Sequence, residues 1–197
     1  MEHKGTITLE TKRLLLRRFT LDDAAAMFRN WASDPEVTKF LLWPAHQELA
    51  VSEAIIRKWS AAYAHSDYYQ WAIVPKSEVE PIGSIAVVAK NETVSMVHLG
   101  YCIGRQWWNK GYTSEALIAI IQFFFEEIGT NRIESRHDPR NPNSGYVMKK
   151  AGLKFEGISR QADHNNQGIC DTENYAILAE DYFVNERSSL TCRHDKL

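Results

Sequence analysis

Apolar residues recur along the chain at two spacings, and each spacing predicts one kind of element. Alternating or continuous apolar runs predict strands, because successive strand side chains point to opposite faces of a sheet. Three such runs follow one another between residues 69 and 103 with polar turns between them, and we expect a meander there. The predicted strands are residues 14–19, 69–74, 83–89, 95–103, 132–137, 154–158 and 170–179.

Helical spacing appears between these strands. Residues 48–64 place apolar side chains four apart, which predicts an amphipathic helix. Residues 114–128 are apolar on nearly every side, as expected of a helix packed against a sheet, and Gly129 is suited to end it. A helix is also predicted after Thr20, which precedes two aspartates, and over residues 141–150.

The order of these elements predicts an α+β fold with a mixed sheet covered by helices. No repeat, low-complexity tract or proline- and glycine-rich linker divides the chain, and 197 residues are enough to bury one core. We therefore expect a single domain over residues 1–182, followed by a C-terminal tail over residues 183–197.

The charge balance narrows the choice of ligand. The chain carries 23 lysines and arginines against 25 aspartates and glutamates, so its formal charge is -2. This balance gives no broad attraction for polyanions, and we expect no nucleic acid as the main ligand. The sequence shows no run of about 18 apolar residues, and its charged start lacks the apolar core of a signal peptide. These features predict a cytoplasmic protein without membrane contact.

The cysteines add no further chemistry. Cys102, Cys170 and Cys192 are an odd number, and their spacing matches no metal site. We expect reduced thiols and no bound metal.

The turn that precedes residue 114 is the most informative part of the chain. An apolar strand passes through Trp107-Trp108-Asn109-Lys110-Gly111-Tyr112-Thr113 into the start of a helix at Ser114. Such a turn can expose free backbone N–H groups, and a helix start adds partial positive charge, so the turn suits a phosphate group. It lacks the spaced glycines of the dinucleotide fingerprint and the Gly-Lys-Ser/Thr of the NTPase loop. A different nucleotide or coenzyme is therefore expected.

Three segments read as one ordered set. They are Leu-Gly-Tyr-Cys-Ile at 99–103, Trp-Asn-Lys-Gly-Tyr-Thr-Ser-Glu-Ala-Leu at 108–117, and Asn-Pro-Asn-Ser at 141–144 leading to Val-Met-Lys-Lys-Ala-Gly-Leu at 147–153. Together with residues 10–23, they resemble the GNAT acyltransferases, in the branch that includes the ribosomal-protein N-terminal acetyltransferases RimJ and RimL. The family's pyrophosphate loop usually reads Arg/Gln-x-x-Gly-x-Gly/Ala, whereas this chain has Trp108 first and Thr113 last.

The resemblance implies an N-acetyltransferase that takes acetyl-CoA as co-substrate. It implies a mostly antiparallel sheet that splays between its fourth and fifth strands, where the pantetheine arm inserts, and direct attack by an amine without an acyl-enzyme. A non-catalytic module that binds or senses acyl-CoA is the alternative. For two of the coenzyme-binding residues that the resemblance implies, the sequence also allows a purely structural interpretation. Asn141 is suited to cap the helix that follows it, and Lys150 is suited to be a solvated residue on that helix. The coenzyme-binding residues implied are Tyr101, Cys102, Ile103, Trp108, Asn109, Lys110, Gly111, Tyr112, Thr113, Ser114, Asn141 and Lys150.

Three residues are candidates for the chemistry. The resemblance implies that Ser144 donates a proton to the leaving thiolate. Because an amine is mostly protonated at neutral pH, a base would assist its attack. His98, on the strand face opposite Val97 and Leu99, competes for this role with Asp163, and positioning with water alone is the third option. Backbone N–H groups at a bulge of the fourth strand are expected to hold the oxyanion.

The acceptor amine is expected to lie against aromatic residues of the amino half. Trp43, Tyr68 and Tyr69 are the candidates for this wall, because each adjoins a break or a polar turn. A protein N-terminus as acceptor would require an acidic groove, and the residues that could form it are Asp34, Glu36 and Asp67. A small-molecule amine is the alternative, and we expect a monomer or a homodimer.

Overall fold

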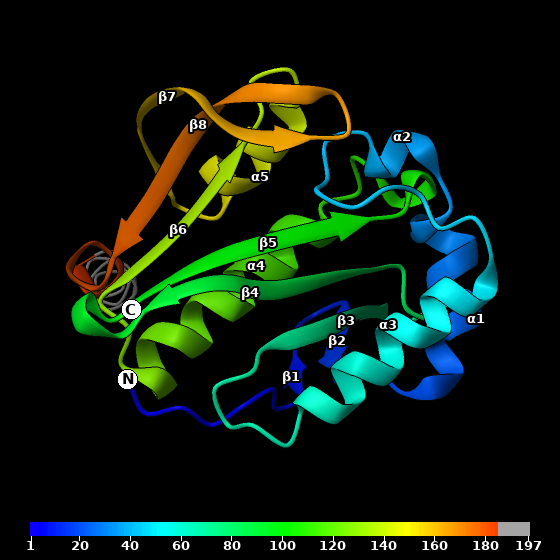
Figure 1. Cartoon of the computed structure of the whole chain (residues 1–197). Helices are drawn as coiled ribbons and strands as arrows, with labels where there is room; N and C mark the ends of the chain where they lie inside the picture. The colour runs from blue at the N-terminus through cyan, green and yellow to red at the C-terminus, as the bar shows by residue number, and fades with distance from the viewer. Residues whose placement is uncertain (185–197) are drawn as a thin grey trace, which may run out of the picture.

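The computed structural model describes residues 1–184, and in this part of the chain the strands form one eight-stranded sheet (Figure 1). Its order is β1-β2-β3-β4-β5-β6-β8-β7, and every neighbouring pair is antiparallel except β5 and β6. The predicted mixed sheet is confirmed. The strands are β1 (Leu9–Glu10), β2 (Leu14–Arg17), β3 (Gln70–Pro75), β4 (Gly83–Asn91), β5 (Met96–Ile103), β6 (Arg132–His137), β7 (Lys154–Asn165) and β8 (Gly168–Leu178).

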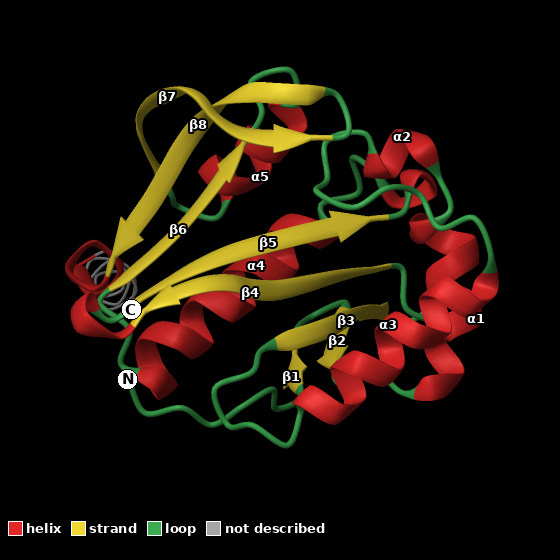
Figure 2. Cartoon of the chain, viewed as in Figure 1, coloured by secondary structure: helices red, strands yellow, loops and turns green. Residues whose placement is uncertain are grey.

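Helices cover both faces of the sheet (Figure 2). The α-helices are α1 (Ala24–Met27), α2 (Pro35–Thr38), α3 (Leu49–Ala62), α4 (Tyr112–Phe123) and α5 (Pro142–Lys150). The other helical turns are η1 (Leu21–Asp23), η2 (Phe28–Ala32), η3 (Glu92–Val94), η4 (Arg105–Trp107) and η5 (Phe124–Ile128). Residues 179–184 are also helical, and the rest of the predicted tail lies outside the described residues.

Strand β3 shows how the two faces are filled. Its residues Trp71 and Ile73 pack into the core that contains α4 and Phe124 of η5, called the α4 core below. The alternate residues Ala72 and Val74 pack into a second cluster with α1 to α3. Because strand side chains alternate between faces, the sheet separates an α4 core from a core formed by the amino-terminal helices.

Strands β5 and β6 pair over a short distance only. The parallel ladder runs from Met96 opposite Arg132 to His98 opposite Glu134, and beyond it the two strands diverge (Figure 1). The sheet thus consists of two parts, β1 to β5 and β6 to β8, which are joined only by this pairing of three residues on each strand.

Two elements differ from the sequence prediction. An Asp-Pro dipeptide such as residues 34–35 is typical of a break between elements, but here it begins α2, because the Asp34 carboxylate accepts a hydrogen bond from the backbone N–H of Glu36 (2.9 Å) and proline suits the first helical position. Strand β7 extends to Asn165 instead of ending at Ile158. Most of β7 is exposed on both faces, so its sequence lacks the apolar alternation that identifies a strand.

Candidate active site

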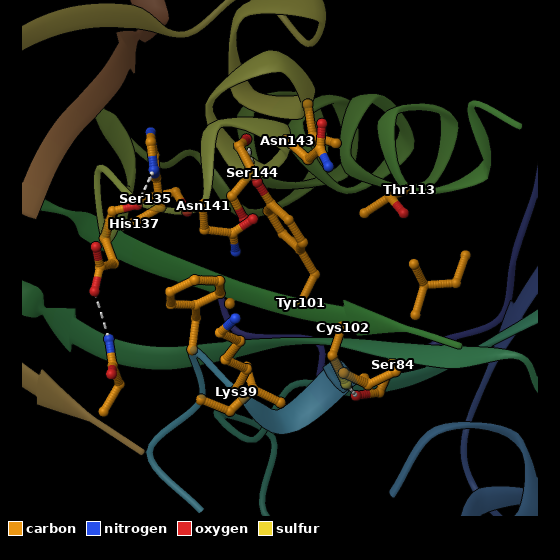
Figure 3. Close-up of a pocket in the computed structure, with 18 of the residues that line it drawn as sticks. Lys39, Ser84, Tyr101, Cys102, Thr113, Ser135, His137, Asn141, Asn143 and Ser144 are labelled. Carbon is orange, nitrogen blue, oxygen red and sulfur yellow. Dashed lines mark hydrogen bonds between the residues drawn. The ribbon is translucent and has the colours of Figure 1, made fainter. Parts of the chain in front are cut away.

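A cavity of about 850 Å³ lies where β5 and β6 separate. It is lined by Tyr101, whose ring packs against the α4 core, and by Cys102, which packs against the core on the other face. The cavity therefore runs through the sheet at the gap. The turn before α4 and the start of α5 form one side, while α2, the loop after it and the tip of the β7–β8 hairpin form the other (Figure 3).

The turn before α4 has the backbone of an anion site. Asn109 and Gly111 lie in the left-handed region, with φ of 59° and 77°. Left-handed residues in such a turn make neighbouring N–H groups converge, and the first N–H groups of α4 have no helical acceptor. The turn lines the cavity through residues that include Trp108, Thr113 and Ser114. A diphosphate fits this arrangement.

Two cations flank the same turn. A Cβ added to Gly111 would lie 3.5 Å from Nη2 of Arg13 and 3.7 Å from Nζ of Lys150. Arg13 is held there by Glu115 (Nε to Oε2, 2.6 Å), and its Nη1 donates to the carbonyl of Lys110. Lys110 thus contributes its backbone to the loop, and its side chain does not line the cavity.

Tyr112 also faces away from the cavity. Its ring lies under the Arg13 guanidinium, 4.5 Å from ring centroid to Cζ, and is absent from the cavity wall. The sequence prediction missed Arg13, because the residue lies about 100 positions before the loop and only the tertiary fold brings the two together.

The start of α5 closes the cavity from the α4 side. The Tyr101 hydroxyl donates to the backbone carbonyl of Ser144 (2.9 Å), and burial raises the pKa of Tyr101, which keeps this hydroxyl protonated. Asn141 makes no capping hydrogen bond with its side chain, so the amide is available to a ligand. Figure 3 shows Asn141 and Ser144 together at this wall.

Gly145 allows α5 to approach β6 closely. A Cβ at this position would lie 2.6 Å from Nε2 of His137, well inside contact distance. The ring of His137 is fixed by a 2.8 Å hydrogen bond between Nδ1 and the backbone carbonyl of Asp138. Nδ1 therefore donates to this carbonyl, and His137 forms part of the wall of the gap.

His98 faces the cavity from β5, on the face opposite Val97 and Leu99. Its Nδ1 lies 3.4 Å from the carboxylate of Glu134 on β6. Burial lowers the pKa of His98 and nearby Arg136 lowers it further, while Glu134 opposes both effects. The imidazole is therefore neutral at neutral pH and can accept a proton.

Asp163 also lines the cavity but is engaged by a cation. Its Oδ2 lies 2.9 Å from Nε of Arg136, and the two side chains form an ion pair. Its other oxygen, Oδ1, accepts the backbone N–H of His164 at 2.9 Å, so both carboxylate oxygens already have partners. The geometry favours His98 over Asp163 as the base.

Side chains and not backbone bonds cross the opening between β5 and β6. The Ser135 hydroxyl donates to the backbone carbonyl of Leu99 (2.8 Å), so this carbonyl points toward β6. The N–H and C=O groups of one strand residue point to the same side of the strand, and this side alternates from each residue to the next. The N–H of Tyr101, two residues after Leu99, therefore also points into the gap. A bulge was predicted on the strand over residues 95–103, which is β5. This prediction is wrong, because the extra residue is Val88 on the neighbouring strand β4.

Aromatic and apolar residues dominate the far end of the cavity. Phe40, Trp43 and Trp59 line it, and the ring of Trp43 lies 5.2 Å from that of His46. Trp43 thus lines the cavity, and its part in an acceptor wall stays a prediction. The buried His46 was missed, and its Nδ1 lies 2.8 Å from the Ser52 hydroxyl.

The tip of the β7–β8 hairpin joins this wall. The side-chain amide of Asn166 donates to the carbonyls of Thr38 and Trp43, each at 2.8 Å, and its backbone N–H donates to the carbonyl of Leu41 (3.2 Å). Residues about 125 positions apart thus form one continuous surface.

The prediction that Tyr68 and Tyr69 belong to the acceptor wall is wrong for this cavity. Tyr69 is 1 % exposed and packs against Trp71 and Phe124 in the α4 core. Tyr68 packs edge-on against Tyr63 and borders a separate depression. The polar turn beside these two residues suggested that their side chains are exposed. In the structure they lie next to the start of β3, and both rings pack against other aromatic side chains.

The acidic groove expected for a protein N-terminus does not form. Asp34 caps α2 and is paired with Arg105 (3.0 Å), and Asp67 is paired with Lys90 outside the cavity. Of the three acids considered, Glu36 alone lines the cavity.

One buried carboxylate of the cavity wall was also missed. Asp138 accepts three hydrogen bonds from the guanidinium of Arg140, and the amide of Asn165 donates to it at 2.8 Å. The guanidinium holds the pKa of Asp138 well below its usual range, so the carboxylate is ionised and fixed. It links the end of β6 to the β7–β8 hairpin, and the short Asp-x-Arg spacing was the available signal.

Residues 1–184 contain no cluster of three or more histidine, cysteine or acidic side chains suited to a metal ion. Within the same residues, no helix is long and apolar enough to cross a membrane.

Comparison with known proteins identifies the family. Residues 13–154 match the acetyltransferase (GNAT) domain. An N-acetyltransferase of Bacillus subtilis, YnaD, is 30% identical over 174 residues, which cover 88% of this chain and 98% of the relative. The N-acetyltransferase p20 of Bacillus licheniformis is 28% identical over 89% of this chain and 98% of its own length.

Solved structures show the same fold. A GNAT acetyltransferase from Bacillus anthracis superposes with a TM-score of 0.77 at 25% identity, covering 88% of this chain and 99% of the other. RimL, the ribosomal L7/L12 acetyltransferase solved with coenzyme A, has a TM-score of 0.78 at 16% identity over 89% and 99% of the two chains. The chain belongs to the GNAT acetyltransferase family and is an N-acetyltransferase that uses acetyl-CoA.

Proposed function

We propose that this enzyme acetylates a primary amine by direct attack in a ternary complex at the β5–β6 gap. The observation that carries the proposal is one continuous cavity that joins the turn before α4, the side chains His98 and Ser144, and the aromatic wall. Such a cavity can hold both substrates at once, so no acyl-enzyme is required.

The proposed roles follow from the positions of the groups. The N–H groups before α4, with Arg13 and Lys150, hold the diphosphate, and Asn141 contacts the pantetheine arm. His98 removes the proton from the attacking amine, and the Tyr101 N–H stabilises the oxyanion. Asp163 orients Arg136 beside His98.

Thiol release tests this function against that of a non-catalytic acyl-CoA module. We expect free CoA to form when acetyl-CoA is mixed with a panel of primary amines, including small amines and peptides with free N-termini, and not when amine is omitted. A binding module would instead be stabilised against heat by acetyl-CoA, by about 2.7 kcal/mol at 100 times the dissociation constant, without turnover of any amine.

Ser144→Ala tests the proposed proton donor. Its hydroxyl lies in the first turn of α5 at the cavity wall, and loss of a general acid lowers kcat by roughly 100-fold. The acetyl-CoA dissociation constant, measured by calorimetry, is expected to change less than about twofold, since coenzyme affinity rests mainly on the diphosphate contacts. Ser144→Thr keeps a hydroxyl and serves as the matched variant. Equal kcat in Ser144→Ala and the wild type would remove Ser144 from the mechanism.

The particular acceptor, the cytoplasmic location and the monomeric or dimeric state stay predictions from the sequence. The RimL structure concerns a ribosomal protein acceptor, and the pairing of Asp34 and Asp67 with basic residues argues against a cationic peptide end in this cavity.

A further inference from the structure

The cationic side chains that line the cavity divide into two kinds. Arg136 and Arg140 are neutralised by Asp163 (2.9 Å) and Asp138 (2.6 Å). Lys39 and Lys150 also line the cavity and have no carboxylate within 4.0 Å among the described residues. Lys150 flanks Gly111, where the coenzyme diphosphate is proposed to bind. Lys39 therefore has no anionic partner: neither a carboxylate of the described residues nor the proposed diphosphate site supplies one.

Lys39 belongs to the acceptor side of the cavity. It is the C-cap residue of α2 and is only partly exposed. Figure 3 shows it on the wall opposite Asn141 and Ser144 and pointing inward. Its ammonium lies 5.6 Å from the ring centroid of Phe40, so the charge is held against an apolar surface. In such surroundings an ammonium gains more from an anionic ligand than it would in water.

The rest of this end is poor in charge. Phe40, Trp43 and Trp59 supply flat apolar surface. Trp31 also lines this end, but its side chain is 0 % exposed, so its unpaired indole N–H does not reach a ligand. The unpaired Lys39 ammonium is the group at this end that favours a ligand with oxygen acceptors. Glu36, the remaining acid at this end, is exposed and forms no ion pair with Lys39 among the described residues.

We propose that the acceptor is a small primary amine that carries an anionic group beside an apolar body, and that Lys39 binds the anion. An α-amino acid with an apolar side chain has this chemistry, with a carboxylate as the anion. A phosphonate or phosphate ester of the same shape would offer the same charge. The proposal rests on the proposed amine acetylation, because it names the substrate class of that site.

The test compares acceptors that differ only in the anion. Phenylalanine, its amide and its phosphonate analogue are offered with acetyl-CoA, and kcat/KM is measured by thiol release. We expect the charged acceptors to exceed the amide by at least about tenfold, the effect of one charge-assisted contact. The amine of phenylalanine amide is less basic than that of phenylalanine, so a larger fraction of it is unprotonated and ready to attack. This difference favours the amide, so it cannot produce the expected preference for the charged acceptors. Carboxylate above phosphonate, or the reverse, identifies the source of the anion.

Lys39→Met is the matching variant, because it removes the charge and keeps the length of the side chain. It is expected to abolish the preference for the charged acceptors and to leave the amide rate within about twofold. Lys58→Met on the exposed face of α3 is the control and should retain the preference. The proposal is overturned if the wild type uses the amide as well as the acid, or if Lys39→Met lowers both rates equally.

Binding separates this proposal from the proposed catalysis. Calorimetry with the same three amines is carried out on the enzyme saturated with CoA. If no amine is acetylated but the charged amines bind in a manner that depends on Lys39, the catalytic proposal fails and the anion site stands. If neutral amines alone are acetylated or bound, catalysis stands and the anion site fails. If no amine is acetylated or bound, both fail.

Discussion

Gly111→Val is expected to weaken acetyl-CoA binding by about 100-fold, the effect of losing two charge-assisted hydrogen bonds. Gly111 has φ of 77°, which a β-branched residue adopts only with strain, and its Cβ would enter the space between Arg13 and Lys150. Both effects displace the N–H groups before α4. Calorimetric titration of acetyl-CoA measures the change.

Gly129→Val is the matched control for this variant. Gly129 has a similar φ of 70° at the end of η5, but a Cβ there would meet nothing within 4 Å. Both variants should lose comparable stability from backbone strain, roughly 1–2 kcal/mol, whereas Gly129→Val alone should keep coenzyme affinity. Equal affinities in the two variants would show that the turn before α4 does not hold the diphosphate.

His98→Gln is expected to lower kcat by about 100-fold, in the range of general-base catalysis. The base acts in its neutral form, so its contribution to the rate should be complete above the pKa of His98 and be lost as the pH drops through it. Because burial and Arg136 lower this pKa, the fall should occur below the ordinary histidine value of about 6.5. The pH profile of kcat/KM checks this expectation, and the variant should lose the ionisation.

A second histidine separates a local effect from a general one. His65 is exposed and borders the depression away from the active-site cavity, so His65→Gln should retain both the rate and the pH profile. If His98→Gln keeps the wild-type ionisation, the base is another group, and Asp163→Asn becomes the variant to measure.

The sequence was most informative where local rules and tertiary structure agree. The helix over 114–128 is observed as α4 and η5, beginning two residues earlier at Tyr112, because its apolar surface and the Gly129 stop are both local signals. The turn at Gly111 was predictable for the same reason, since a left-handed glycine before a helix is a short-range pattern.

The sequence was least informative where distant segments meet. Tyr69 was predicted at the acceptor wall but lies in the core, since its environment is set by Phe124, more than 50 residues away. Arg13 was not predicted beside the diphosphate turn because its partner Glu115 lies 102 positions later in the chain, on the helix that packs beside β2. The length of β7 was missed because a two-sided polar strand has no apolar period.

The three hydrogen bonds of Asn166 bear on how acceptor preference can change within the family. The proposed acceptor wall is built jointly by the loop after α2 and by a hairpin near the other end of the chain. A transplanted loop with a different backbone path would leave the Asn166 amide without its carbonyl partners, because these partners are main-chain atoms. Under the proposed function, a change of acceptor selectivity would therefore require exchanging the loop and the hairpin tip together.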